Sequence, residues 1–409
     1  MSEFDFTKVV KSKLPPQGAP WTAFPEYNFV GGHNDTDSLP IEKLTKACAD
    51  VMRREGSTLA TYSLESGPQG YIRLREFLVT KLKKYAAIEC HANDILLTSG
   101  SLQAIDLINA ALLQAGDTVI VEESNYGGVL SRLNQLGCNM VAIPVDDQGM
   151  QTDKLNEALA NLTSQGIKPA YIYSIPTVHN PTGTIMSQAR REQLIDLADQ
   201  YDVPVFEDEC YADLVWSGVR PAALYSIDKT SKVIHVGSFS KTIAPALRVG
   251  YVVANWSLMG HLLALKNDAG SGALEQMLLA EYCTEHFDSH LQNLNTNLQL
   301  KLTALTNAID REFGTSATYS TPPGGIFLWV KLPDTVNTDV LERTAAAEGV
   351  SINPGAQWSL QSDSKQWLRL CFANPDIDTI DAGITRLAQI CFRQFGVPVR
   401  SHNAVNSQA

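Results

Sequence analysis

The sequence predicts an α/β protein, with a mostly parallel sheet of seven strands between helices and a smaller α+β domain. The first observation is a set of seven short runs that are nearly all apolar, as expected for strands covered on both faces. The second is that helical patterns separate the first five runs, which is typical of βαβ units. The third is a change of pattern after residue 313, where shorter strand and helix candidates follow.

The expected strands of the large sheet, in chain order, are Ile95–Thr98, Thr118–Glu122, Met140–Val145, Ala170–Ile175, Val203–Glu207, Lys232–Gly237 and Val249–Ala254. The helices expected between the first five are Leu102–Gln114, Gly128–Leu136, Thr152–Leu162 and Ser187–Gln200. A long helical stretch over residues 256–313 leads into the second region. There we expect strands at 327–330, 350–352 and 368–371, and helices at 338–348 and 379–395.

The chain of 409 residues is long enough for two domains. We expect an N-terminal arm (1–58) that joins the small domain, a large domain (59–295) and a small C-terminal α+β domain (296–409). The net charge of −12 argues against nucleic acid or an anionic membrane as a partner. No run approaches about 18 consecutive apolar residues, so no membrane-spanning helix is expected.

The seven cysteines are dispersed and none shows C-x-x-C spacing. This argues against a disulfide framework or a zinc site and favours the reducing cytoplasm. The histidines show no credible metal face, and the pair His286 and His290 fits a solvated helix surface. We therefore expect no metal.

Chemistry-bearing residues follow the strands, where ligands bind in open α/β sheets. Ser99-Gly100-Ser101-Leu102 opens a helix after the first strand, which suits either a phosphate or an ordinary capped helix start. Ser238-Phe239-Ser240-Lys241, with Arg248 nearby, follows the sixth strand. These groups can neutralise a phosphate and leave a lysine amine beside it for Schiff-base chemistry, although most lysines are merely solvated.

Two further strands end in polar groups. Asn180-Pro181-Thr182-Gly183 is a turn that holds an amide side chain in place. Asp208-Glu209-Cys210-Tyr211 places an acid at a buried strand end, which is costly unless the acid meets a cation. A helix cap for Asp208 and a core phenol for Tyr211 are the alternatives.

Taken together, these motifs resemble the fold-type I pyridoxal-phosphate enzymes of the aspartate aminotransferase superfamily. Their order and spacing agree across roughly residues 60–375. Thr61-Tyr62, Gly67-Pro68-Gln69-Gly70 and the segment 321–329 look like the 2-aminoadipate and aromatic aminotransferase branch. The resemblance implies the fold-type I transferase fold and pyridoxal 5'-phosphate as cofactor.

The resemblance also implies residue roles. Lys241 would hold the cofactor as a Schiff base and shuttle a proton at the substrate α-carbon, through a quinonoid intermediate. Asp208 would pair with the ring nitrogen, Asn180 and Tyr211 would hydrogen-bond the phenolate oxygen, and Tyr126 would stack on the ring. The residues implied for the phosphate are Gly100, Ser101, Leu102, Ser238, Ser240 and Arg248.

Other implied contacts lie at the subunit boundary and at the substrate. Tyr62 matches a tyrosine that reaches the phosphate of the partner subunit, so the resemblance implies a homodimer with the active site at the interface. Ser271 is a further candidate for that phosphate site. Arg369 would grip the substrate α-carboxylate, helped by Asn180, because its planar fork suits a bidentate contact.

The sequence departs from the branch at Gly31-Gly32-His33-Asn34-Asp35, where an apolar contact is common. We expect Gly32 and His33 near the substrate, which suggests a polar or cationic side chain or a non-standard amino acid. The predicted function is transamination between an α-amino acid and a 2-oxo acid. Elimination, replacement or S-adenosylmethionine-directed chemistry stays open. An amino-acid-sensing regulator would need a basic, helical DNA-binding domain before this region, and the irregular first forty residues and the net charge of −12 argue against one.

Overall fold

The computed structural model describes residues 4–10, 17–18, 20–21, 23–361 and 363–398, and its main element is a seven-stranded sheet. The strand order is β2-β10-β9-β8-β7-β3-β4. Only β10 runs antiparallel to its neighbours in this sheet. The strands are β2 Ile95–Thr98, β3 Thr118–Glu122, β4 Asn139–Ile143, β7 Tyr171–Ser174, β8 Val205–Asp208, β9 Val233–Ser238 and β10 Gly250–Val253. The predicted sheet is confirmed.

Prolines account for the small differences between the expected and observed strand ends. β4 ends at Ile143 because Pro144 follows it, and β8 begins at Val205 because Pro204 precedes it. Proline has no N–H group for the ladder. β2 and β3 occupy the expected residues, since both are continuous buried runs bounded by polar residues.

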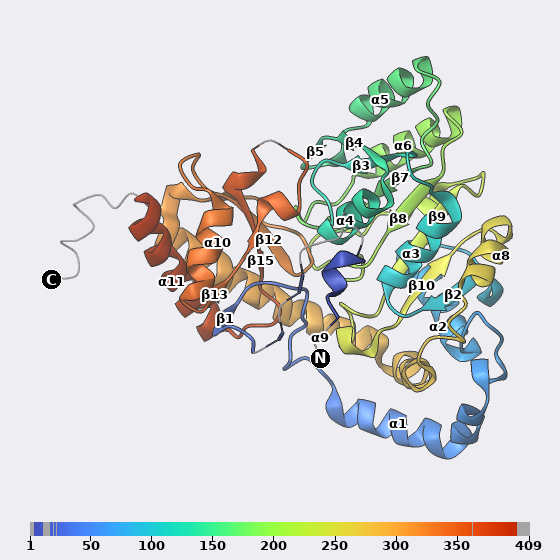
Figure 1. The fold of residues 1–409 in the computed structure, drawn as a ribbon. Helices are drawn as coiled ribbons and strands as arrows, with labels where there is room; N and C mark the ends of the chain where they lie inside the picture. Colours follow the sequence, from blue (N-terminus) through green and yellow to red (C-terminus); the bar gives the residue numbers. More distant parts are fainter. Residues whose placement is uncertain (1–3, 11–16, 19, 22, 362, 399–409) are drawn as a thin grey trace.

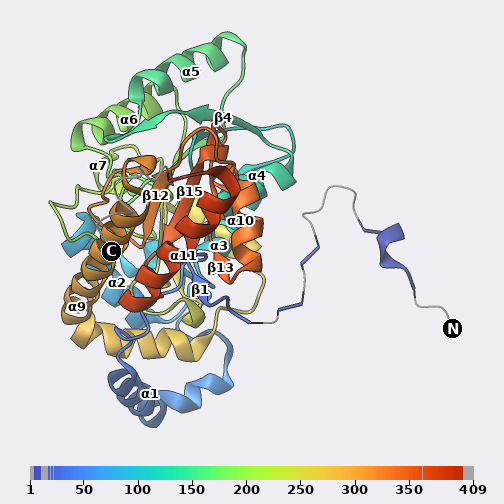
Figure 2. The same cartoon turned by 90° about the vertical axis from the view of Figure 1, so that its left-hand side faces the viewer.

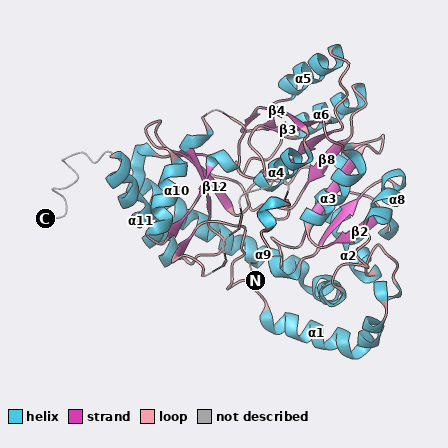
Figure 3. Cartoon of the chain, in the orientation of Figure 1, coloured by secondary structure: helices cyan, strands magenta, loops and turns pink. Residues whose placement is uncertain are grey.

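Helices cover both faces of the large sheet (Figure 3). Side chains such as Leu96, Val121 and Phe206 face one helical layer, and Ile120 and Ile172 face the other. The first layer contains α3 (Ser101–Leu112), α4 (Gly127–Leu136) and α8 (Trp256–Leu265). The second contains α5 (Thr152–Ser164), α6 (Gln188–Gln200) and α7 (Leu224–Ile227), and it continues into α2 (Ile72–Ala86) and α9 (Ala273–Phe313).

A second body contains the four-stranded antiparallel sheet β11-β12-β15-β14 and lies beside the first (Figure 1). α9 runs from one body to the other. The strands are β11 Thr318–Tyr319, β12 Phe327–Lys331, β14 Asn353–Pro354 and β15 Trp367–Cys371, and the helices are α10 (Thr338–Ala347) and α11 (Ile377–Phe395). The expected α+β region is present, while its boundary at residue 296 stays a prediction.

The N-terminal part of the chain lies against this second body. Its strand β1 (Tyr27–Asn28) pairs with β13 (Val350–Ser351) in parallel. The described residues before β1 extend away from the body (Figure 2), and α1 (Ile41–Glu55) lies at the lower edge in Figure 1. The chain thus crosses from the small sheet to the large domain through residues 29–40.

The helical stretch expected over residues 256–313 is wrong as a single element. α8 ends at Leu265 and α9 begins at Ala273. Between them Ala269 and Gly270 have φ angles of 61° and 108°, which a right-handed helix excludes. Among the described helices, none is long and apolar enough to cross a membrane.

Candidate active site

A cavity of about 280 Å³ lies at the carboxyl ends of the large-sheet strands, where the second body meets them. Residues from both bodies line it because β7, β8 and β9 end on one side and β12, β14 and β15 face them from the other. The lining residues are Gly31, Gly32, Ser101, Leu102, Tyr126, Ile175, Asn180, Asp208, Cys210, Tyr211, Ser238, Ser240, Lys241, Arg248, Phe327, Asn353, Trp358 and Arg369.

Lys241 follows β9 and projects its amine into this cavity. Its Nζ donates a hydrogen bond to the Gly32 carbonyl oxygen at 2.7 Å. Burial lowers the pKa of the lysine below its ordinary value, and the positive charges of Arg369 and Arg248 act in the same direction. A larger fraction of the amine is therefore unprotonated than for a surface lysine, as a nucleophile or a proton acceptor requires.

Asp208 is the last residue of β8 and is buried. Its carboxylate accepts a hydrogen bond from the Tyr173 hydroxyl at 2.6 Å and one from the Cys210 backbone N–H at 3.2 Å. Burial raises the pKa of Asp208 even though these donors lower it. Among the described residues, no lysine or arginine forms an ion pair with it, so the carboxylate is placed to receive a cation from the cavity.

One end of the cavity is suited to an anion. Ser101 and Leu102 begin α3, whose first N–H groups have no partner within the helix. Gly100 has a φ angle of 77°, and a side chain there would collide with the Arg248 guanidinium. Arg248 donates to the carbonyl oxygens of Ser99 and Pro245 at 3.3 and 3.0 Å.

Arg369 on β15 defines the opposite end. Its Nη1 donates to the Asn180 side-chain oxygen at 3.0 Å. Its Nη2 donates to the Asn353 side-chain oxygen at 2.9 Å and to the Gly31 carbonyl oxygen at 3.1 Å. Burial lowers the pKa of Arg369 to about 10, so the group keeps its positive charge at neutral pH. A buried, planar guanidinium that lines the cavity suits a carboxylate.

Four of the predicted residues lie outside the cavity lining. Gly100 forms the turn just before it. The partly buried His33 ring lies against Gly31 and Phe24, and burial and the Lys241 charge lower its pKa. Tyr62 is 84% exposed and lines another hollow with Ser271, so it does not reach the site of its own chain.

Sequence reasoning missed several lining residues. Asn353 begins the short strand β14, Trp358 lies in the segment between β14 and β15, and Ile175 directly follows β7. Phe327 belongs to the segment 321–329 and Cys210 to the segment 208–211, but the sequence predicted no role for either residue. The signal for Ile175 was its place at a strand end, whereas Asn353 and Trp358 reach the cavity only through packing between the two bodies.

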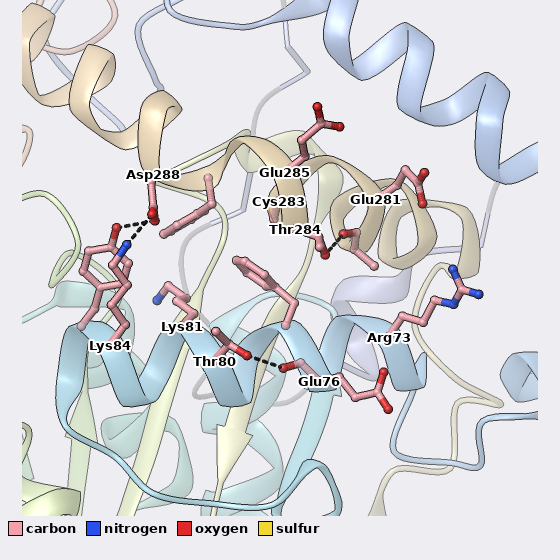
Figure 4. A pocket seen from close by; sticks show the side chains of 14 residues that line it. Arg73, Glu76, Thr80, Lys81, Lys84, Glu281, Cys283, Thr284, Glu285 and Asp288 are labelled. Carbon is pink, nitrogen blue, oxygen red and sulfur yellow. Dashed lines mark hydrogen bonds and ion pairs between the residues drawn. The ribbon is translucent and has the colours of Figure 1, made fainter.

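A larger hollow of about 720 Å³ lies elsewhere, between α2 and α9 (Figure 4). Its rim carries charges of both signs, including Arg73, Glu76 and Glu285. Lys81 lies at its inner side, where its Nζ pairs with the buried Asp213 at 2.7 Å. The described residues that line this hollow all belong to α2 and α9, and none of them lies at the end of a strand of the large sheet.

Comparison with known proteins agrees with this geometry. The model of the family "Aminotransferase class I and II" matches residues 28–387. Aromatic-amino-acid aminotransferase 1 of Thermococcus litoralis is 30% identical, over 88% of this chain and 87% of its own length. The HTH-type transcriptional regulator YdfD of Bacillus subtilis, itself uncharacterised, is 31% identical over 83% of this chain and 69% of its own length.

A solved structure supports the same relationship. The crystal structure of LysN, the α-aminoadipate aminotransferase of Thermus thermophilus, was determined with N-(5'-phosphopyridoxyl)-L-leucine. It matches with a TM-score of 0.81 and 29% identity, over 88% of this chain and 91% of its own.

Proposed function

The chain belongs to the class I and II aminotransferases and is a pyridoxal-phosphate-dependent transaminase, and from this premise we propose how its own residues divide the work. When bound, pyridoxal phosphate supplies an electron sink for the electron pair released at the substrate α-carbon. The protein must hold the cofactor at three points and the substrate at one, and must move one proton.

The cavity fits the cofactor on observations of its own. The end of the cavity that is suited to an anion has the free N–H groups of α3, the Ser238 and Ser240 hydroxyls and the Arg248 guanidinium. Because residue 100 is a glycine, the Arg248 guanidinium can pack against the turn before α3, where a side chain would collide with it. Asp208 is a buried carboxylate with no lysine or arginine partner among the described residues, and a protonated ring nitrogen would supply the missing cation. We assign Ser101, Leu102, Ser238, Ser240 and Arg248 to the phosphate.

Four side chains are assigned to the ring, between the phosphate end of the cavity and the Arg369 end. Asp208 would keep the ring nitrogen protonated, Tyr126 would stack on the ring, and Asn180 and Tyr211 would donate hydrogen bonds to the ring oxygen. The contact between Asn180 and Arg369 links the ring oxygen to the substrate position. A substrate whose carboxylate binds Arg369 therefore has its α-carbon beside the Lys241 amine.

Lys241 is the proton carrier in this proposal. Its amine is buried and its pKa is lowered by burial, so it can accept the α-proton and return it at the cofactor carbon. The contact between Lys241 Nζ and the Gly32 carbonyl oxygen holds the amine near residues 31–32. Transamination is supported by this single arrangement: the Lys241 amine lines the same cavity as the Arg369 guanidinium and the Asp208 carboxylate.

The test is a single turnover of the holoenzyme with a panel of amino acids, followed by the visible absorbance of the cofactor. Conversion to the pyridoxamine form, reversed by a 2-oxo acid, is the expected result. Release of ammonia or another product without that conversion supports elimination or replacement instead. The Lys241→Ala variant is the control, since it should lose both the cofactor's lysine-dependent band and turnover.

We also propose a homodimer in which Tyr62 enters the partner's phosphate site. Tyr62 is 84% exposed and lies far enough from its own cavity to line a separate hollow. Mixing the Tyr62→Ala and Lys241→Ala variants tests this. A mixed dimer has one site with both residues intact if Tyr62 acts across the interface, so activity should reappear. If Tyr62 acts within its own chain, no mixed dimer regains activity.

The seven free cysteines support a proposed cytoplasmic location.

A further inference from the structure

The carboxylate of Glu122 lies behind the candidate active site and is 1% exposed. Glu122 is the last residue of β3 and does not line the cavity. Its oxygens accept hydrogen bonds from the Ser174 hydroxyl at 2.7 Å and from the Ile175 backbone N–H at 3.1 Å. These two contacts fix the carboxylate to the end of the neighbouring strand β7.

A third contact leads from Glu122 to Tyr126. The Asn125 side-chain amide donates to Glu122 Oε2 at 3.2 Å, and the Asn125 side-chain oxygen accepts the backbone N–H of Tyr126 at 2.7 Å. Asn125 is fully buried. The turn that presents Tyr126 to the cavity is therefore held by an amide that Glu122 orients.

A fourth contact leads from Glu122 to Asn180. His179 Nε2 lies 3.3 Å from Glu122 Oε2, and its Nδ1 lies 2.8 Å from the Thr182 hydroxyl. Thr182 thus holds the imidazole through Nδ1, while Nε2, which has no hydrogen-bond partner among the described atoms, faces the Glu122 carboxylate. The next residue is Asn180. The two side chains that Glu122 reaches indirectly come from the ends of two different strands, β3 and β7.

We propose that Glu122 is a positioning residue that sets the stacking ring of Tyr126 and the amide of Asn180 relative to each other. This inference rests on the proposed roles of these two residues toward the cofactor. One buried carboxylate accepts hydrogen bonds from Asn125 and from the end of β7, and it faces the His179 imidazole at 3.3 Å. A shift of either turn therefore changes a contact of this one carboxylate. Losing such an acceptor leaves buried donors unpaired, which the surrounding apolar core makes costly.

The expected consequence is specific to the cofactor. A donor from Asn180 withdraws negative charge from the ring oxygen, so displacement of Asn180 should raise the pH midpoint of the bound cofactor's visible band. Displacement of Tyr126 should weaken cofactor binding without moving that midpoint. Glu122→Gln removes the charge at nearly constant size. It should raise the pH midpoint of the visible band and weaken cofactor affinity about tenfold.

The experiment compares holoenzyme variants by absorbance titration, cofactor dissociation constant and thermal unfolding. Glu123→Gln is the matched control, because Glu123 is the adjacent residue and its carboxylate accepts only from the Val145 backbone N–H among the described donors. His179→Gln should raise the midpoint, and Asn125→Ala should weaken affinity alone. These two variants carry the test if Glu122→Gln does not fold.

The inference is overturned if Glu122→Gln keeps the wild-type midpoint and affinity, or if Glu123→Gln changes both equally. In the case where Glu122→Gln does not fold, it is overturned if His179→Gln and Asn125→Ala both match the wild type. A wild-type enzyme with no band that depends on Lys241 would instead refute the proposed function. The two failures are thereby distinguishable.

Discussion

The guanidinium carbon of Arg369 lies 3.4 Å from the centre of the Trp358 ring. Trp358 also contacts the first body. The Trp358 carbonyl oxygen accepts the Asn125 backbone N–H at 2.8 Å, and the Trp358 ring lies 5.9 Å from the Tyr126 ring. The Phe327 ring centre lies 3.7 Å from the same guanidinium carbon. Aromatic rings thus hold the arginine that we assign to the substrate carboxylate.

Replacing Trp358 by alanine should raise the KM for the amino acid roughly thirtyfold, since a desolvated cation–π contact contributes about 2 kcal/mol. Trp358→Phe should recover most of the loss because it keeps a ring over the guanidinium. Trp367→Ala is the control: Trp367 stacks on Trp329 and does not line the cavity. Steady-state kinetics give the comparison, and an unchanged KM in Trp358→Ala would show that the ring has no part in substrate binding.

Arg369→Lys should weaken binding of the substrate carboxylate by on the order of 1.5–3 kcal/mol, because a lysine cannot reproduce the two parallel charged hydrogen bonds. An amine that lacks the carboxylate should bind both enzymes equally. Arg191→Lys serves as the comparison, since Arg191 is also buried but bonds only to groups away from the cavity. Equal affinity of Arg369→Lys and wild type for amino acids would remove the carboxylate assignment.

Lys241 should capture pyridoxal phosphate at a lower pH than an ordinary lysine. Burial lowers its pKa below 10.5, and only the unprotonated amine attacks an aldehyde. The capture rate of cofactor-free protein should therefore rise with pH and level off below pH 10.5. Stopped-flow absorbance measures this profile, with Lys241→Ala as the blank. A midpoint at or above the ordinary lysine value would contradict the lowered pKa.

Much of the fold could be predicted because local pattern decides it. The runs Ile95–Thr98 and Thr118–Glu122 are buried on both faces, and their composition alone marks them as strands. The break at residues 266–272 was also visible in principle, because Gly270 and Gly272 interrupt the helical pattern. The expectation of a single helix gave too much weight to the apolar periodicity on either side.

The residues of the candidate site also fall into two groups: those that the order of strands places, and those that packing between the two bodies places. Lys241, Asp208 and Asn180 follow strands of one sheet, so topology alone brings them together. Asn353 on β14 and Trp358 in the segment after it belong to the second body, and their positions depend on packing between distant segments. Tyr62 does not line the cavity of its own chain, so its place at a partner's phosphate site stays a prediction.

Lys81 should matter for stability rather than for catalysis. Its Nζ lies 2.7 Å from Asp213, and Arg220 pairs with both Asp213 and Glu209 at 2.9 Å. All four charges are nearly buried. Lys81→Met leaves Asp213 with one cation, and breaking a buried pair in this way typically costs about 3–5 kcal/mol. Lys84→Met removes an exposed partner of Asp288 near the same hollow (Figure 4) and should cost less than about 1 kcal/mol.

The pH dependence separates this ion-pair effect from a simple packing defect. Burial raises the pKa of Asp213, but Lys81 and Arg220 outweigh it and hold the pKa below 3.8. A carboxyl with a lowered folded-state pKa contributes stability above its unfolded-state pKa and loses it as the pH falls through the folded-state value. In Lys81→Met that pKa rises, so acid unfolding should begin at higher pH than in the wild type. Urea midpoints between about pH 3 and 7 test this, and parallel curves for the two proteins would assign the loss to packing alone.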